Sequence, residues 1–244
     1  HINSGTVGYG HYFFVDFFKG ILENQPNAKV SNVQFAWQEL VRGQLYKTGH
    51  KYYEEREAEK EKIKKINKKI YDRSDEDINY IYDEDKKLSL EYFDSMYKML
   101  GQSFDFFFFE SEVAGKGKEI VEQNIGKVFE NGDGGAVVFK AENLDKSLNT
   151  RVFINGEGLP TYEAKELGLA EKKNEKYKYD KSIVITGNEI NDYFKVLLCA
   201  MKQIFPELAS KTLHFSHGML RLPTGKMSSR TGDVITAESL IEML

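Results

Sequence analysis

A loop rich in cations, hydroxyl groups and glycines lies near the C-terminal end of the sequence. It runs from Leu222 to Gly232 and reads LPTGKMSSRTG. Glycines let a backbone approach a ligand closely, hydroxyl groups donate hydrogen bonds to phosphate oxygens, and a cation such as Lys226 neutralises a departing phosphate group. The composition suits a flexible loop that closes over a polyphosphate, but composition alone is explained more often by an ordinary basic surface loop. The GxxxxGK[ST] spacing of a P-loop is absent from it.

Bulk composition restricts the class of protein that carries this loop. The 244 residues are 41% hydrophobic and 30% charged, with a net charge of -4, which is typical of a soluble globular protein and argues against polyanion binding over the whole surface. The apolar runs are shorter than the ~20 residues of a membrane span, so we expect no membrane segment. Cys199 is the single cysteine, so no disulfide can form within the chain, and a reducing compartment such as the cytoplasm is expected.

Helices are predicted for most of the first hundred residues, at Phe13–Ile21 and through the region 33–70. In the second half of that region Ile63, Ile66 and Ile70 have the spacing of one apolar helix stripe. Glu61 and Lys65 are one turn apart and are expected to support this helix. The lysines that surround the stripe are open to two interpretations, a solvated helix face or a face that contacts RNA.

The pattern changes from helix to strand near residue 103. An acidic turn or cap at Ser74–Asp77 is predicted before one helix, and the periodicity of Leu88–Leu100 predicts a further helix, which Gly101 ends. Strands are then predicted at 103–109, with Phe106–Phe109 buried on both faces rather than forming an exposed recognition patch, and at 136–140. The glycine-rich segment 131–135 is a strong turn signal before the second of these strands.

Strands and helices alternate through the remaining sequence, which favours an α/β fold. This predicts a mostly parallel sheet covered by helices, where ligands bind at the carboxyl ends of the strands. We expect residues 1–102 to form a helix-rich part or insertion and residues 103–244 to form a Rossmann-type portion. The predicted elements are strand 151–155, a helix at 162–167 that Gly168 stops, strand 182–186, helix 191–204, strand 211–215 and a last helix from Ala237.

The loop resembles the KMSK motif of class I aminoacyl-tRNA synthetases, in the form found in arginyl-tRNA synthetases. Ser229 stands at the second lysine position of that motif, and Arg230 follows it. The resemblance implies that Lys226 and Arg230 stabilise pyrophosphate as it leaves ATP. It also assigns ATP binding to His217, Gly218, Gly225, Lys226, Met227, Ser228 and Ser229.

Two further segments resemble parts of the arginine pocket in the same family. In the segment 151–167, Tyr162 matches a substrate-contacting tyrosine, and Glu166 stands where the family has an aspartate that pairs with the guanidinium group. Glutamate is one methylene longer than aspartate, but a carboxylate still suits a planar guanidinium. Glu189 matches the second segment, in which Ile190 and Tyr193 replace a glutamine and a histidine.

The histidines before the loop lie on a segment, Leu213–Met219, that matches the strand leading into the family's motif. His214 and His217 are not expected to bind a metal, because alternation on a strand does not aim them at one face and no further ligand set is evident. The HIGH motif of class I synthetases is absent from the sequence, and Gly8–His11 is interpreted as a chance partial match. We expect the HIGH element upstream of His1 and an anticodon-binding domain downstream.

The resemblance implies part of an arginine–tRNA ligase with a class I Rossmann-type sheet and a helical insertion. It would use L-arginine, ATP with Mg²⁺ and tRNA(Arg), and the fragment by itself is expected to be a monomer that is inactive. Two alternatives remain at this point. One is a non-catalytic relative that binds a ligand or tRNA, and the other is a different class I synthetase or nucleotidyltransferase.

Overall fold

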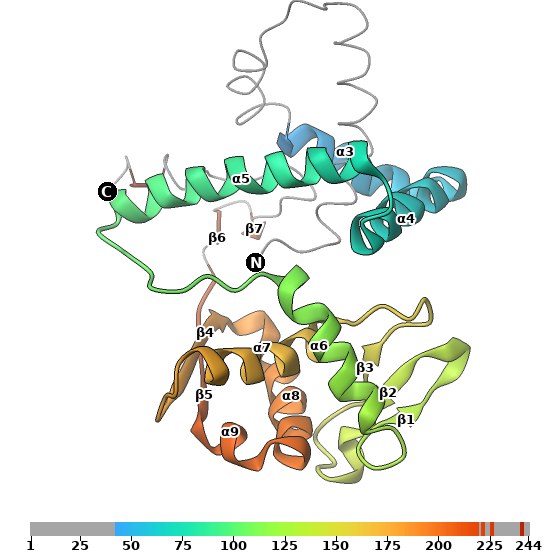
Figure 1. Ribbon diagram of the computed structural model, residues 1–244, viewed down its shortest axis with the longest axis vertical. Coiled ribbons are helices and arrows are strands. Elements are labelled where there is room, and N and C mark those ends of the chain that lie inside the picture. The colour runs from blue at the N-terminus through green and yellow to red at the C-terminus, as the bar shows by residue number, and fades with distance from the viewer. Residues whose placement is uncertain (1–41, 220, 223–224, 227–239, 242–244) are drawn as a thin grey trace, which may run out of the picture. The chain divides into compact units, whose positions relative to one another are not determined.

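The computed structural model describes residues 42–219, 221–222, 225–226 and 240–241 (Figure 1). The chain divides into two compact units, of which one contains the described residues before Phe108 and after Met219 and the other spans Phe108–Met219. The helix predicted at Phe13–Ile21 lies outside the described residues, as does most of the one predicted from Ala237.

Three helices make up most of the described residues of the first unit: α3 (Arg42–Glu55), α4 (Glu57–Asp72) and α5 (Glu76–Met99). The predicted apolar stripe of α4 is confirmed at Ile63, which is 3% exposed. The Glu61 carboxylate accepts a hydrogen bond from Lys64 Nζ at 2.9 Å, and the expected attraction to Lys65 is present as a smaller contribution that also lowers the pKa of Glu61.

The predicted acidic cap precedes α5. The Asp75 carboxylate accepts a hydrogen bond from the backbone N–H of Ile78 at 3.1 Å, which satisfies one of the free donors of the first turn. The helix begins at Glu76 and runs without a break to Met99, so the helix predicted after the cap and the further helix predicted at Leu88–Leu100 form one element. Its predicted end is confirmed, since Gly101 has a φ of 64° two residues after Met99.

Two helices cross at very short range in the second unit: α6 (Glu110–Gln123) and α7 (Tyr162–Lys176), visible in Figure 1. A Cβ atom added to Gly117 would lie 2.1 Å from the Ala164 carbonyl oxygen, and one added to Gly168 would lie 2.5 Å from the Val113 carbonyl oxygen. Gly168 thus serves close backbone packing inside α7. The prediction that it ends the helix is wrong, since α7 continues to Lys176.

A small antiparallel sheet lies beside these helices, formed by β1 (Glu130–Asn131), β2 (Val137–Phe139) and β3 (Arg151–Ile154). The predicted turn between the first two strands is confirmed, with left-handed φ values of 62° at Gly134 and 82° at Gly135. The strands at 136–140 and 151–155 are confirmed too, but not in a parallel arrangement. The segment that joins β2 to β3 contains only a 3-10 turn, and parallel strands need a crossover of about a dozen residues or more.

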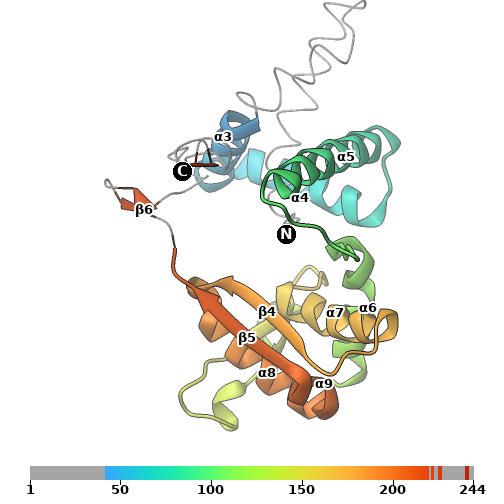
Figure 2. The same ribbon diagram turned by 90° about the vertical axis from the view of Figure 1, so that its left-hand side faces the viewer.

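The predicted parallel arrangement is found farther along the chain. The strands β4 (Ser182–Gly187) and β5 (Thr212–His217) are parallel neighbours, joined through α8 (Asn191–Ile204) and α9 (Pro206–Lys211). Figure 2 shows the two strands side by side with these helices against them. The buried side of α8, which includes Phe194 and Leu197, belongs to the same apolar core as the rings of Phe129, Phe139 and Phe153.

The other face of this strand pair exposes apolar side chains. Ile183 is 58% exposed, Ile185 69% and Phe215 55%. Parallel strands are normally covered on both faces, so an exposed apolar face of this kind is typical of a contact surface.

The four consecutive phenylalanines do not form the predicted buried strand. Among the described residues 103–109 there is no strand, and Phe106 and Phe107 are 43% and 55% exposed. Within the described residues this segment has no neighbouring strand to pair with, so its β propensity does not produce a strand. The Phe104 ring lies 4.6 Å from that of Tyr97 and 6.1 Å from that of Phe107, in edge-on contacts.

The start of the cation-rich loop forms a short hairpin from β6 (Arg221–Leu222) and β7 (Gly225–Lys226), in which Arg221 pairs with Lys226 and Leu222 with Gly225. None of the helices in the described part of the chain is long and apolar enough to cross a membrane.

Candidate active site

The carboxyl ends of β4 and β5 bring three of the predicted site residues to one edge. Gly187, the last residue of β4, is in register with His217, the last of β5. Gly218 follows directly, and Glu189 lies in the 3-10 turn Asn188–Ile190 that follows β4. Ligands of parallel α/β sheets bind at this edge. The structure therefore places Glu189, His217 and Gly218 where a nucleotide or amino-acid site is expected, and their individual roles stay predictions.

The Met219 side chain contacts the end of this strand pair. A Cβ atom on Gly187 would lie 2.7 Å from the sulfur of this exposed, flexible side chain, which could move aside to admit it. The exposed His217 ring has its Nδ1 2.7 Å from the Gly218 carbonyl oxygen. Because a carbonyl oxygen can only accept, Nδ1 carries the proton and a neutral ring offers Nε2 as an acceptor.

The other histidine of β5, His214, is held by contacts within the protein. The His214 ring stacks on Phe194 with centroids 4.0 Å apart, and its Nε2 lies 2.7 Å from the Thr186 hydroxyl oxygen. Burial lowers the pKa of His214, which favours the neutral ring. Within the described residues no group of three potential metal ligands gathers. That no metal binds stays a prediction.

A turn between β3 and α7 sets the position of the other predicted pair. The Asn155 side-chain oxygen accepts hydrogen bonds from the backbone N–H groups of Glu157 and Leu159 at 3.0 and 2.9 Å, and Gly158 takes a left-handed φ of 74°. The Thr161 hydroxyl then donates to the Val152 carbonyl oxygen at 2.8 Å. These bonds fasten the first turn of α7 to β3.

Tyr162 and Glu166 lie one helical turn apart on α7, so they share one side of the helix. Tyr162 is 38% exposed, and Glu166 is half-buried. In the part of the chain that the structure describes, Glu166 makes no hydrogen bond or ion pair. Burial raises the pKa of Glu166, and the nearby Lys173 ammonium only partly opposes that effect. Lys173 itself donates to the Ser182 hydroxyl at 3.1 Å.

Three residues outside the predicted set complete this cluster: Arg151, Glu163 and Tyr193. The Arg151 guanidinium lies 3.4 Å from the Glu163 carboxylate, whose side chain is 10% exposed, and 5.7 Å from the centre of the Tyr193 ring. Burial and the carboxylates of Glu166 and Glu163 raise the pKa of Tyr193, so its hydroxyl stays protonated and can donate a hydrogen bond.

The sequence held a signal for only one of these three residues. Tyr193 occupies the family's histidine position, which marked the site but not the role. Arg151 and Glu163 are twelve residues apart on different elements, so no local spacing indicates that they pair.

A buried ion pair fixes α7 against α6 next to the cluster. Lys165 Nζ donates to the Glu110 carboxylate at 2.8 Å, and the two side chains are 6% and 15% exposed. The same ammonium group lies 5.6 Å from the centre of the Tyr162 ring. The first turn of α7 is therefore held from one side by β3 and from the other by α6.

Of the six loop residues predicted to bind phosphate, two lie within the described part of the chain. Gly225 and Lys226 lie in the β6–β7 hairpin, whereas Met227, Ser228, Ser229 and Arg230 lie outside the described residues. The roles assigned to all six residues stay predictions.

Comparisons with known proteins agree on one family. A family model described as "tRNA synthetases class I (R), catalytic domain" matches residues 19–243. Arginine–tRNA ligases of Bacteroides thetaiotaomicron and Phocaeicola vulgatus are 37% and 35% identical to this chain over 153 and 152 residues. Each match covers 62% of this chain and 25% of the relative, so the chain spans about a quarter of the length of these curated relatives.

Solved structures show the same fold at lower identity. The arginyl-tRNA synthetase of Thermus thermophilus is similar over 98% of this chain and 43% of its own, with a TM-score of 0.58 at 16% identity. That of Plasmodium falciparum is similar over 90% of this chain and 34% of its own, with a TM-score of 0.58 at 15% identity. These matches confirm the predicted fold class, and the family model, which spans all but the first residues and the last one, shows that the chain belongs to the catalytic-domain family of class I arginyl-tRNA synthetases.

Proposed function

We propose that this chain forms part of the catalytic region of an arginine–tRNA ligase, which activates L-arginine with ATP and transfers the arginyl group to tRNA(Arg). The observation that carries the proposal is the Glu166 carboxylate, which is half-buried and without a hydrogen-bonding or ionic partner in the described structure. A carboxylate taken out of water without a partner costs free energy, so such a group is a candidate for ligand binding.

The chemistry of L-arginine fits this position. Its guanidinium stays charged at all ordinary pH values and can donate two parallel hydrogen bonds to one carboxylate. The Glu166 carboxylate lies near enough to Tyr193 to raise the pKa of that tyrosine, Tyr162 lies one helical turn before Glu166, and aromatic faces attract cations. Glu163 is not available in the same way, because Arg151 already pairs with it.

The proposed activation step requires cations that stabilise the negative charge on the leaving pyrophosphate. The carboxylate of arginine attacks the α-phosphorus of ATP, the bond to the β-phosphate oxygen breaks, and pyrophosphate leaves. We assign Lys226 and Arg230 to the charge that develops on pyrophosphate, and ATP binding to His217, Gly218, Gly225, Met227, Ser228 and Ser229. Mg²⁺ would accompany the ATP phosphates. Catalysis of this kind is electrostatic and positional, without a covalent enzyme intermediate.

We further propose that these 244 residues do not catalyse activation by themselves, because their sequence contains no His-x-Gly-His motif to complete the ATP site. The protein would act as a monomer. One cysteine in the sequence fits a reducing compartment such as the cytoplasm.

Thermal unfolding with added amino acids tests the arginine site directly. Ligand at about 100 times its Kd stabilises the native state by about 2.7 kcal/mol. At about 2–4 °C per kcal/mol for a chain of this size, L-arginine should raise Tm by roughly 5–11 °C. L-Lysine and L-citrulline, which lacks the charge but keeps the shape, should give much smaller shifts.

The variant Glu166→Gln should lose the shift with L-arginine. Glu175→Gln is the matched control, because it removes an exposed carboxylate from the same helix. Equal shifts with citrulline and arginine, or a full shift in the Glu166→Gln variant, would contradict the proposed pocket. Arginine-dependent pyrophosphate exchange by the chain alone, with tRNA supplied, would refute its proposed inactivity.

A further inference from the structure

The helix α4 carries more lysines than carboxylates, so its own acidic side chains cannot neutralise all of its positive charge. Its sixteen residues, EAEKEKIKKINKKIYD, contain six lysines, three glutamates and one aspartate. Lysine is favourable on any exposed helix, so number alone indicates little. The informative question is which of these lysines already have partners.

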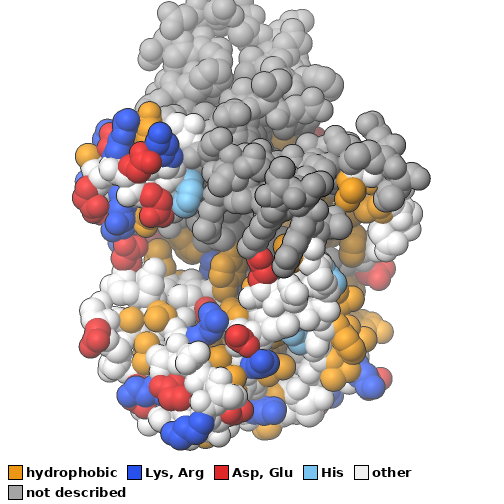
Figure 3. Space-filling model, turned by 180° about the vertical axis from the view of Figure 1, so that it is seen from behind, with side chains coloured by type: hydrophobic (Ala, Val, Ile, Leu, Met, Phe, Trp, Pro, Cys, Tyr) orange, Lys and Arg blue, Asp and Glu red, His pale blue; other side chains and the backbone are white. Residues whose placement is uncertain are grey.

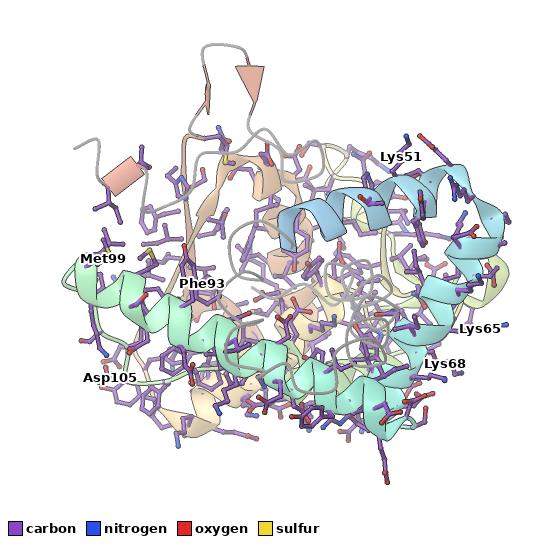
Figure 4. The ribbon with its side chains drawn as sticks, turned by 90° about the horizontal axis from the view of Figure 1, so that it is seen from above. Lys51, Lys65, Lys68, Phe93, Met99 and Asp105 are labelled. Carbon is purple, nitrogen blue, oxygen red and sulfur yellow. The ribbon has the colours of Figure 1, made fainter. Side chains whose placement is uncertain are left out.

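Several carboxylates near α4 are paired by lysines of the same segment. Lys60 lies 3.7 Å from Glu57, Lys64 lies 2.9 Å from Glu61, and Lys69 lies 2.8 Å from Asp75 at the start of α5. The lysines Lys65 and Lys68 are exposed and form no ion pair within the described part of the chain. Figure 4 shows the two next to each other on the outer side of α4, with Lys51 on α3 along the same edge.

The packing of α4 keeps these two lysines outward. Ile63 is 3% exposed and anchors the opposite side of the helix, so the helix cannot roll to bury the lysines without exposing its apolar stripe. Lys65 and Lys68 are three residues apart and therefore neighbours on the surface. Lys62 extends the row by another three residues. Figure 3 shows this region of α3 and α4 as a mixture of basic and acidic side chains.

We infer that the outer face of α4 is an RNA-binding surface, in which Lys65 and Lys68 contact phosphates of the tRNA backbone. This inference rests on the proposed function for the identity of the RNA. Lys62 to Lys68 spans about 9 Å of helix axis at 1.5 Å per residue. One nucleic-acid strand carries a phosphate about every 3.4 Å of axis, so two or three phosphates fit this length. Asp72, one turn beyond Lys68, is exposed at the end of the row and opposes binding.

The test measures the affinity of the full chain for a tRNA(Arg) transcript as a function of salt concentration. Each phosphate contact contributes about 0.7–0.9 to the slope of log K against log salt. The double variant Lys65→Gln/Lys68→Gln should therefore make that slope shallower by about 1.4–1.8. Lys127→Gln/Lys146→Gln removes the same charge from two exposed lysines of the other unit and should leave the slope as in the unaltered chain. Asp72→Asn should strengthen binding.

Three outcomes would overturn the inference: no RNA binding by the unaltered chain at low salt, equal slopes in the two double variants, or weaker binding in Asp72→Asn. None of these bears on the arginine pocket, which the thermal shift with L-arginine reports independently. The Lys65→Gln/Lys68→Gln variant should keep that shift in full, because both lysines lie on α4 and the pocket residues lie on α7 and α8.

Discussion

Replacing Lys165 with methionine tests how α7 is held in place. Methionine keeps most of the apolar stem but removes the ammonium group that donates to Glu110 at 2.8 Å. With side-chain exposures of 6% and 15%, this is a buried pair, and loss of one partner of such a pair costs about 3–5 kcal/mol. Glu110 is the first residue of α6, where the helix N-terminus offsets about 0.3–1 kcal/mol of the lost interaction. We therefore expect destabilisation near 3 kcal/mol.

Native-state hydrogen exchange at the amides of α6 and α7 is the suitable assay, because it reports the second unit separately from the first. Lys172→Met is the control, since Lys172 joins Glu112 at 3.1 Å across the same two helices but the side chains are 37% and 40% exposed. An exposed pair of this kind contributes about 0–1 kcal/mol. The double variant Lys165→Met/Glu110→Gln should recover part of the loss, because it removes both charges of the pair. The reasoning is refuted if Lys165→Met and Lys172→Met cost the same, or if the double variant costs the sum of its single changes.

Two further predictions concern the same helices. Gly117→Ala should destabilise the second unit by about 1–3 kcal/mol or more, because the new Cβ meets the Ala164 backbone. Gly115→Ala on the same helix meets nothing within 4 Å and should stabilise by up to about 1 kcal/mol. Chemical unfolding of both variants measures the difference. Burial raises the pKa of Glu166, so the native state holds its proton more tightly than the unfolded state, and stability should fall as pH rises upward from the ordinary value of 4.5. Glu166→Gln should flatten that fall and be more stable than the unaltered chain at neutral pH, and an unchanged pH profile of unfolding would contradict it.

The sequence predicted those elements whose local chemistry is decisive. Asp75 as a helix cap, the glycine turn at 131–135 and the strand–helix–strand order through β4, α8 and β5 follow from residue preferences over a few positions, and the structure has all of them. These features can be predicted because each depends on residues close in sequence: a side-chain oxygen that caps a helix, a glycine that takes a left-handed φ, and apolar residues at a regular spacing.

The failures share a cause that lies outside the local sequence. Glycine at position 168 predicts a helix end, but in α7 it allows close packing against Gly117, which is fifty-one residues away on another helix. The Phe106–Phe109 run has strand propensity but no partner strand in the described structure. Arg151 could not be predicted as the partner of Glu163 for the same reason. Contacts between distant elements decide these positions, and one sequence does not contain that information.

The two glutamates at the start of α7, Glu163 and Glu166, are told apart by their contacts in the structure. In the sequence, the family resemblance assigns the guanidinium contact to Glu166, and Glu163 lies three residues before it. The structure separates them, because Arg151 pairs with Glu163 while Glu166 is left half-buried without a partner among the described residues. If a folded protein retains a carboxylate in a position that costs stability, a ligand that repays the cost when bound is the simplest physical reason. A cation with the shape of a guanidinium meets that requirement, because it stabilises the ionised form that burial disfavours.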